Sequence, residues 1–255
     1  MMNMTPIVKQ LLIINILFFI GTMALGDFNP NNPAYRILAL YYFENPDFGF
    51  WQLITHMFMH GGFAHIAFNM FALYSFGSTL EHFWGGKKFL FFYISCGLGA
   101  ALFNSAINYY FFNNGLNILE SSGLNKIEIL QILSEGKINS RWQEILTVSQ
   151  YQHFIEAYFG NVVGASGAIY GLLIAFTFMF PNAELGIMFI PIPIKAKYFV
   201  PIYMLLFDGF FGIFGNSLMG IESGIAHYAH IGGALFGFLI MWYWKKNQFN
   251  NNRWN

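Results

Sequence analysis

Residues 164–171 read Gly-Ala-Ser-Gly-Ala-Ile-Tyr-Gly and place one serine, Ser166, between glycines where a polar segment ends and an apolar run begins. Glycines on both sides permit an unusual turn and a close approach of other groups to the hydroxyl. A helix beginning here would direct unpaired backbone N–H groups at an oxyanion formed beside Ser166. The same residues also fit a small-residue seam that packs membrane helices together. The stretch alone therefore leaves two hypotheses, a nucleophilic site and a packing seam.

The composition of the 255-residue chain is that of an integral membrane protein. It is 56% hydrophobic and 9% charged, with a mean hydropathy of +0.48, whereas soluble domains average about 25% charged residues. The formal net charge of +0 argues against nucleic acid as a partner. Cys96 is the single cysteine, which excludes an intrachain disulfide and predicts a buried thiol.

Six apolar stretches approach the roughly 20 residues that a membrane-spanning helix needs. In the first stretch an apolar run follows Lys9, a pattern that also occurs in signal peptides. The run is long for a signal peptide and no clear cleavage site follows it, so we expect a retained membrane anchor. We predict an all-α membrane protein with six transmembrane helices in one domain, residues 1–246, and a polar cytoplasmic tail, residues 247–255. The six predicted spans are 7–25, 61–80, 88–112, 165–181, 198–216 and 227–244.

The distribution of lysine and arginine predicts that both termini face the cytoplasm. This orientation puts eight of the 12 basic residues on the cytoplasmic side and leaves the other four in long external loops. Ser166 then lies near the external end of the fourth span. One loop, residues 26–60, is rich in aromatic residues and is expected to be half-immersed at the external surface. The other, residues 113–163, is a polar external insertion between the third and fourth spans, predicted to hold one or two short amphipathic helices over or beside the bundle.

Polar side chains inside predicted spans are costly and mark functional sites by default. His65 and Asn69 are four residues apart and share one helix face. The last span begins at His227, and His230 lies near its external end, at the depth expected for Ser166. Gly167 and Gly171 on the fourth span, and Gly233 and Gly237 on the sixth, form small-residue seams. If these seams face each other, they bring Ser166 to His230.

This arrangement predicts nucleophilic catalysis by a Ser166–His230 dyad, with His230 as general base. Asn69, His65 and the backbone N–H groups at Ser166 and Gly167 are candidate oxyanion donors. No acidic third member is evident, because Asp27, Asp47 and Asp208 all lie far from these motifs in the sequence. We expect packing or Tyr170 to orient the histidine instead.

A zinc site is the rival interpretation. Five histidines could gather around a metal ion: His56, His60, His65, His227 and His230. The HExxH pattern is absent and no carboxylate interleaves these histidines, so we expect neither a metal nor another cofactor. His56 and His60 are instead expected to hydrogen-bond backbone groups of the half-immersed loop. Glu81 is expected to cap or pair with a neighbouring segment.

Three motifs taken in order resemble the rhomboid intramembrane serine proteases: His60-x4-His65-x3-Asn69, Gly164-Ala-Ser166-Gly167, and Ala229-His230-Ile-Gly-Gly233-x3-Gly237. Trp51-x3-Thr55-His56 and Glu81 also resemble the bacterial pattern, and the resemblance covers the chain from the first span to residue 244. It implies that Ser166 is the nucleophile, that His230 is the base and that His65 and Asn69 help to bind the oxyanion.

The resemblance further implies a water-filled cavity that opens outward. Membrane-spanning protein substrates would enter from the lipid bilayer and be cut near the external surface of a bacterial inner membrane. Two departures stand out. Gln52 occupies a position where relatives often carry arginine, so an anchoring contact of the loop is in question, and the insertion 113–163 is longer than usual.

Two other classes of function compete with an active protease. A catalytically silent relative would act as a membrane-protein binding factor, but such relatives typically lose the serine or histidine, and both are present here. A transporter would show paired charges in several spans and inverted repeats. The sequence names neither a substrate nor an oligomeric state.

Overall fold

The computed structural model describes residues 4–26, 28, 32–187, 190–214 and 226–248, with the backbone alone described at 187, 190–192, 207, 211–214 and 247–248. Most of these residues are helical. The helices of the main bundle, together with α9, are α1 (Pro6–Gly26), α4 (Phe63–Ala72), α5 (Ser78–Trp84), α6 (Gly86–Ser121), α9 (Val148–Phe159), α10 (Ser166–Met179), α11 (Ala196–Met204) and α13 (His227–Gln248). Short helices are α2 (Pro33–Leu38), α3 (Gln52–Thr55), η1 (His56–Phe58), α7 (Lys126–Ser134) and α8 (Arg141–Ile145), and wider π-helical segments are η2 (Leu73–Gly77) and η3 (Leu205–Phe214).

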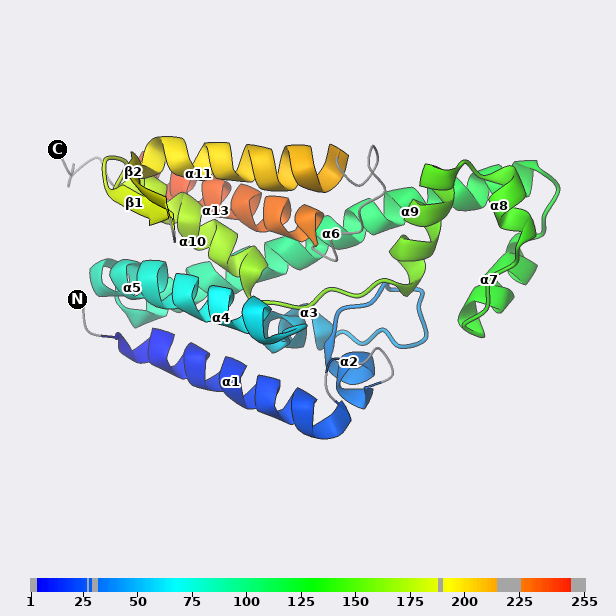
Figure 1. Cartoon of the computed structure of the whole chain (residues 1–255), viewed down its shortest axis with the longest axis horizontal. Helices are drawn as coiled ribbons and strands as arrows, with labels where there is room; N and C mark the ends of the chain where they lie inside the picture. The colour runs from blue at the N-terminus through cyan, green and yellow to red at the C-terminus, as the bar shows by residue number, and fades with distance from the viewer. Residues whose placement is uncertain (1–3, 27, 29–31, 188–189, 215–225, 249–255) are drawn as a thin grey trace.

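Helices α6, α10 and α13 pack mutually and form the centre of the molecule. Figure 1 shows α1 and the α4–α5 helix on one side of this trio and α11 on the other. Each of the six predicted spans contains a helix, the fifth as far as Phe214, and its last two residues, 215–216, lie outside the described residues. Among the described helices, α1 and α6 are long and apolar enough to cross a membrane, and α10 is a shorter apolar helix.

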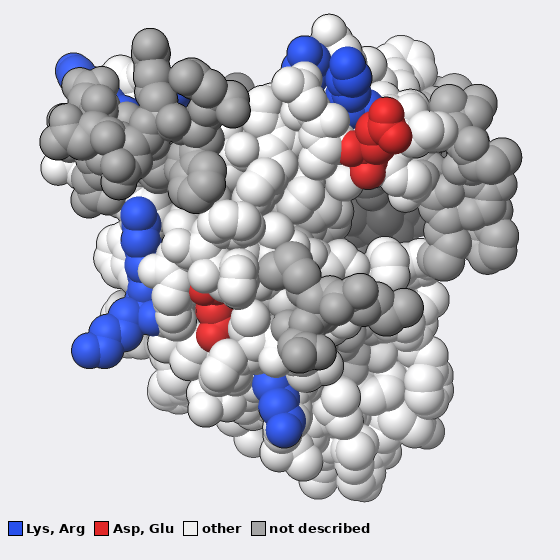
Figure 2. Space-filling model, turned by 90° about the vertical axis from the view of Figure 1, so that its left-hand side faces the viewer, with Lys and Arg blue, Asp and Glu red and all other residues white. Residues whose placement is uncertain are grey.

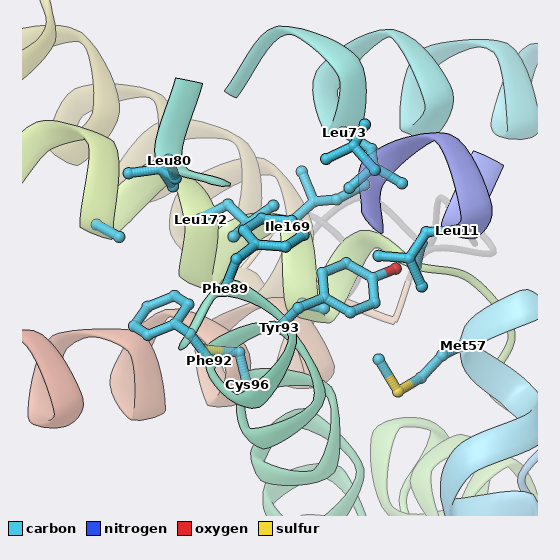
Figure 3. Packing of buried hydrophobic residues seen from close by; sticks show 14 of the residues in the cluster. Leu11, Met57, Leu73, Leu80, Phe89, Phe92, Tyr93, Cys96, Ile169 and Leu172 are labelled. Atoms are coloured by element: carbon cyan, nitrogen blue, oxygen red, sulfur yellow. The ribbon is translucent and has the colours of Figure 1, made fainter. Parts of the chain in front are cut away.

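The main hydrophobic core joins α1, η2, α5, α6, α10 and α13. Figure 3 shows Leu11, Leu73 and Leu172 converging on the aromatic side chains of α6. Phe89 and Phe92 are fully buried there, and burial of one such side chain stabilises a fold by about 1.5–3 kcal/mol. The thiol of Cys96 is buried in the same core, as predicted.

Residues 113–163 are more helical than the sequence predicted. Helix α6 continues nine residues past the predicted end at 112 to Ser121, and three helices rather than one or two follow it. They enclose a second core of Phe112, Leu116, Trp142, Phe154 and Tyr158, which also takes in Tyr42. Figure 1 places these helices at the end of the bundle opposite to the start of α1.

A β-hairpin of β1 (Glu184–Ile187) and β2 (Ile190–Lys195), which was not predicted from the sequence, follows α10. The strands are antiparallel, with Glu184 opposite Lys195. The hairpin lies at the end of the molecule where α1 begins and α13 ends (Figure 1). Figure 2 views this end and shows basic side chains spread around its rim.

Glu81 caps the first turn of α1, as expected for a structural role. Its carboxylate accepts hydrogen bonds from the backbone N–H groups of Ile7 and Val8, both at 2.9 Å, and from the Thr5 hydroxyl. These donors have no partner within the helix, and a negative charge is favourable at a helix N-terminus. The cap ties α1 to α5 across more than 70 residues of sequence.

Candidate functional site

Ser166 is the first residue of α10, and the loop before it brings His65 alongside. Gly164 has a φ of +123°, a conformation that L side chains rarely adopt. A Cβ atom at Gly164 would also lie 2.8 Å from Nε2 of His65 and 3.5 Å from Oγ of Ser166. Glycine at 164 therefore lets the His65 ring reach the space beside the serine.

The two glycine seams pack against each other, as expected. A Cβ atom at Gly233 would collide with the Gly167 carbonyl, and one at Gly237 would lie 2.7 Å from the Cα atom of Gly171. Because α10 and α13 touch backbone to backbone, the side chains at their ends also meet. Nε2 of His230 lies 2.8 Å from Oγ of Ser166, a hydrogen-bond distance.

The expectation that no acidic residue joins this pair was wrong. Oδ1 of Asp208, on η3, lies 2.8 Å from Nδ1 of His230 and also 2.8 Å from Nδ1 of His227. Asp208 lies 22 residues before His230, so sequence proximity did not reveal the contact. The sequence offered one indication that Asp208 has a role: an ionisable residue inside an apolar helix is energetically costly.

Tyr170 packs directly against His230. Its ring stacks on the imidazole with 4.2 Å between ring centroids and 14° between planes. Tyr170 lies one helical turn after Ser166, so α10 carries both the hydroxyl and the surface against which the histidine packs. The ring of His230 is held by packing on one face and by hydrogen bonds at both nitrogens.

His65 and Asn69 line the same cavity as Ser166. The backbone N–H of Gly61 donates to Nδ1 of His65 at 3.3 Å, which leaves the proton of a neutral ring on Nε2, the nitrogen beside Gly164. Asn69 donates one amide hydrogen to the His65 carbonyl at 2.9 Å and keeps a second one. Gly167 contributes a backbone N–H in the first turn of α10. His65 and Asn69 therefore offer hydrogen-bond donors in the cavity that contains Ser166, and Gly167 directly follows the serine.

The five histidines of the rival metal site do not gather. His56 lies in the loop, where its Nδ1 is 2.7 Å from the Gln52 carbonyl, as expected for a structural role. His60 packs edge-on against His65, but its buried ring nitrogens have no hydrogen-bond partner among the described residues, contrary to expectation. His227 and His230 do meet, together with Asp208, and ligand-type atoms of these three lie within 4.8 Å of one another. Among the described residues, this trio is the group whose ligand atoms lie close enough together to hold a metal ion.

Gln52, which stands where the resemblance led us to question an anchoring contact, does anchor the loop. Its side chain is fully buried and its Nε2 lies 2.7 Å from the Asp47 carbonyl and 3.1 Å from the Arg36 carbonyl. Its Oε1 accepts a hydrogen bond from the Tyr41 backbone at 3.2 Å. A neutral amide thus ties three parts of the loop together, and Arg36 instead pairs with Asp47 at the surface.

A cavity of about 1250 Å³ contains Ser166 and His230 and extends well beyond them. One part is apolar and lies between α4, α10 and α11, with Phe68, Phe71 and Phe176 among its lining residues. The other part meets the polar face of α9, at Ser149, Gln152 and Glu156. The volume exceeds that of typical small-molecule pockets, which supports an extended or bulky ligand.

The family model and the curated proteins that match this chain are all described as rhomboid. The family model described as a rhomboid domain matches residues 47–118 and 143–247 and leaves 119–142, the segment around α7, unmatched. "Rhomboid protease AarA" of Providencia stuartii is 29% identical over 201 residues, which are 74% of this chain and 54% of that protein. "Rhomboid protein 1, mitochondrial" of Saccharomyces cerevisiae is 25% identical over 202 residues, 76% and 42% of the two chains. The chain spans about half the length of the curated relatives it matches.

Proposed function

This chain belongs to the rhomboid family, and from that premise we propose that it is an intramembrane serine endopeptidase that cleaves membrane-spanning proteins. The observation that carries the proposal is the 2.8 Å contact between Oγ of Ser166 and Nε2 of His230. A serine hydroxyl is a weak nucleophile until a base accepts its proton. A histidine at hydrogen-bond distance supplies that base.

The reaction has two steps. Nε2 of His230 takes the hydroxyl proton as Oγ of Ser166 attacks the peptide carbonyl, and the same proton then passes to the leaving amine as the acyl-enzyme forms. Water, deprotonated by His230, attacks the ester and releases the carboxylate product and the free serine. Each step passes through a tetrahedral oxyanion.

We assign the oxyanion site to Asn69, His65 and the backbone N–H groups at the start of α10. The support is that His65 and Asn69 line the cavity that contains Ser166, and that Nε2–H of His65 and one amide hydrogen of Asn69 have no hydrogen-bond partner among the described residues. The N-terminus of α10 adds partial positive charge near Ser166 and Gly167. Donors that are fixed before the reaction cost no reorganisation when charge develops.

For the membrane we propose six spans with both termini in the cytoplasm and the insertion 113–163 outside. Two observations support this orientation. The start of α1 and the end of α13 lie at one end of the bundle (Figure 1), and that end carries the basic rim of Figure 2. Cytoplasmic segments are enriched in lysine and arginine. Ser166 lies at the other end of α10, so the site would open to the external side of a bacterial inner membrane.

The test is labelling of the purified, detergent-solubilised chain with a fluorophosphonate probe, followed by cleavage of a transmembrane substrate. Wild type should be labelled and should cleave, whereas Ser166→Ala and His230→Ala should do neither while keeping a wild-type unfolding temperature. Labelling of Ser166→Ala would remove the proposed nucleophile. A folded wild type that neither reacts nor cleaves would favour the alternative, a silent membrane-protein binding factor.

A further inference from the structure

Asp208 is a buried carboxylate whose partners are both histidines of the first turn of α13. Its side chain is 2% exposed, and a charge at such a position is costly unless it is paired. Oδ1 lies 2.8 Å from Nδ1 of His230 and 2.8 Å from Nδ1 of His227. An ionised carboxylate only accepts hydrogen bonds, so both Nδ1 atoms are the donors.

This pairing decides which nitrogen of His230 is the base. A neutral imidazole carries one proton, and a proton held on Nδ1 by Asp208 leaves the lone pair on Nε2. Nε2 is the nitrogen that faces Oγ of Ser166 at 2.8 Å. The opposite tautomer would present an N–H to the serine and could not accept its proton. The carboxylate also stabilises the imidazolium that forms when the proton arrives.

His227 completes the arrangement from the other side. A second N–H on the same oxygen restrains rotation of the carboxylate, so that Oδ1 stays directed at His230. Tyr170 stacks on the His230 ring. The carboxylate, the two imidazoles and the phenol come from three elements, η3, α13 and α10.

We propose that Asp208 is a positioning residue that extends the Ser166–His230 pair to a triad, with His227 holding the carboxylate in place. The inference rests on the proposed protease function and adds the group that sets the tautomer of the base. It predicts an effect on the chemical step and none on substrate binding, because Asp208 contacts the base on the side away from the serine.

The test compares Asp208→Asn and Asp208→Glu in the full chain, with steady-state cleavage of a transmembrane substrate. The asparagine fills the same space, but its amide can donate to Nδ1 of His230 and so favour the wrong tautomer. Its kcat should fall by roughly 10²–10⁴-fold with KM within about twofold. Asp208→Glu keeps the carboxylate, and its kcat should be at least about tenfold higher than that of Asp208→Asn. Wild-type kcat in Asp208→Asn would overturn the proposal, as would a loss carried by KM alone.

Two further variants keep the result interpretable. Asp47→Asn makes the same change in the exposed ion pair with Arg36 and should leave kcat and KM unchanged. His227→Ala leaves Asp208 in place and should lower kcat by about tenfold at constant KM, which serves as the test if Asp208→Asn fails to fold. Unchanged kcat in folded His227→Ala would overturn its assigned role. If the wild-type protein neither cleaves the substrate nor reacts with the fluorophosphonate probe, that result contradicts the proposed protease function. Failure of the triad alone would instead appear as unchanged kcat in the Asp208 variants of an active protein.

Discussion

The backbone carbonyl of Gly167 occupies the space that a Cβ atom on Gly233 would need, so α10 and α13 are in direct backbone contact at this point. Gly167 follows Ser166 by one residue, and Gly233 lies one turn after His230. The contact between the two glycines therefore fixes the distance between the two reacting side chains.

Gly233→Ala should lower both stability and activity, because the added methyl group must separate the two helices. Overpacking of this kind costs about 1–3 kcal/mol, and a shift of the helices lengthens the 2.8 Å contact between Ser166 and His230. Thermal unfolding and the cleavage rate measure the two effects. Gly21→Ala is the matched control, since nothing lies within 4 Å of its added Cβ atom on α1. Equal effects of the two substitutions would contradict the close-packing argument.

Asn69→Ala should lower turnover by roughly tenfold or more, somewhat less than the roughly 10²–10³-fold reported for loss of a sole oxyanion donor, because His65 and the backbone donors remain. The loss should appear in kcat, since the oxyanion exists only in the transition state and the intermediates. Asn113→Ala is the control. Asn113 makes the same bond to a carbonyl four residues earlier, but it does not line the cavity. An unchanged rate for Asn69→Ala would take Asn69 out of the site.

Local sequence patterns predicted the elements that carry Ser166, His230, His65 and Asn69, and the family match confirms the resemblance drawn from those motifs. The sequence alone shows which residues share one face of a helix, because this depends only on their spacing, as for Gly233 and Gly237. Asp208 could not be found in this way, because its contact with His230 depends on how η3 packs against α13. The extension of α6 to Ser121 was also missed, because its exposed polar residues are typical of a loop, whereas Leu116 and Leu119 between them are buried in the second core around Phe154. The proline-containing strand β2 gave no clear signal.

Removal of the Glu81 carboxylate should loosen the start of α1. Glu81→Ala leaves the N–H groups of Ile7 and Val8 without their partner, which costs about 1–3 kcal/mol for buried donors. Hydrogen exchange at these two amides should accelerate, and the unfolding temperature should fall. Glu128→Ala, at an exposed position on α7, is the control and should change neither measurement. Protection of the Ile7 and Val8 amides in Glu81→Ala would show that other groups hold this end.

Acidification should destabilise the loop that contains His56. Burial lowers the pKa of His56 from 6.5 to about 4, so between these values the unfolded chain binds a proton that the folded chain excludes. Stability is therefore complete above pH 6.5 and falls as the pH drops, by up to about 1.4 kcal/mol per pH unit for this group. The free energy of unfolding in detergent should drop by about 2 kcal/mol between pH 7 and pH 5 on account of His56.

His60, whose pKa is lowered to about 3 by burial, adds a change of the same sign. His56→Gln should remove only the His56 part, and a wild-type pH dependence in that variant would contradict this assignment.

Chelation should leave the proposed protease unaffected. The histidine–carboxylate trio of Asp208, His227 and His230 could hold a metal ion, but its two 2.8 Å contacts are hydrogen-bond distances, and a zinc ion would take the Nδ1 positions of the protons that we assign there. A metal on Nδ1 would move the ring proton of His230 to Nε2 and remove the base. We therefore expect full cleavage and labelling after treatment with a chelator, and inhibition when excess zinc is added. His227→Ala, which removes one ligand, should weaken that inhibition. Loss of activity on chelation, restored by zinc, would instead mean that the trio holds a functional metal and that the triad is wrong.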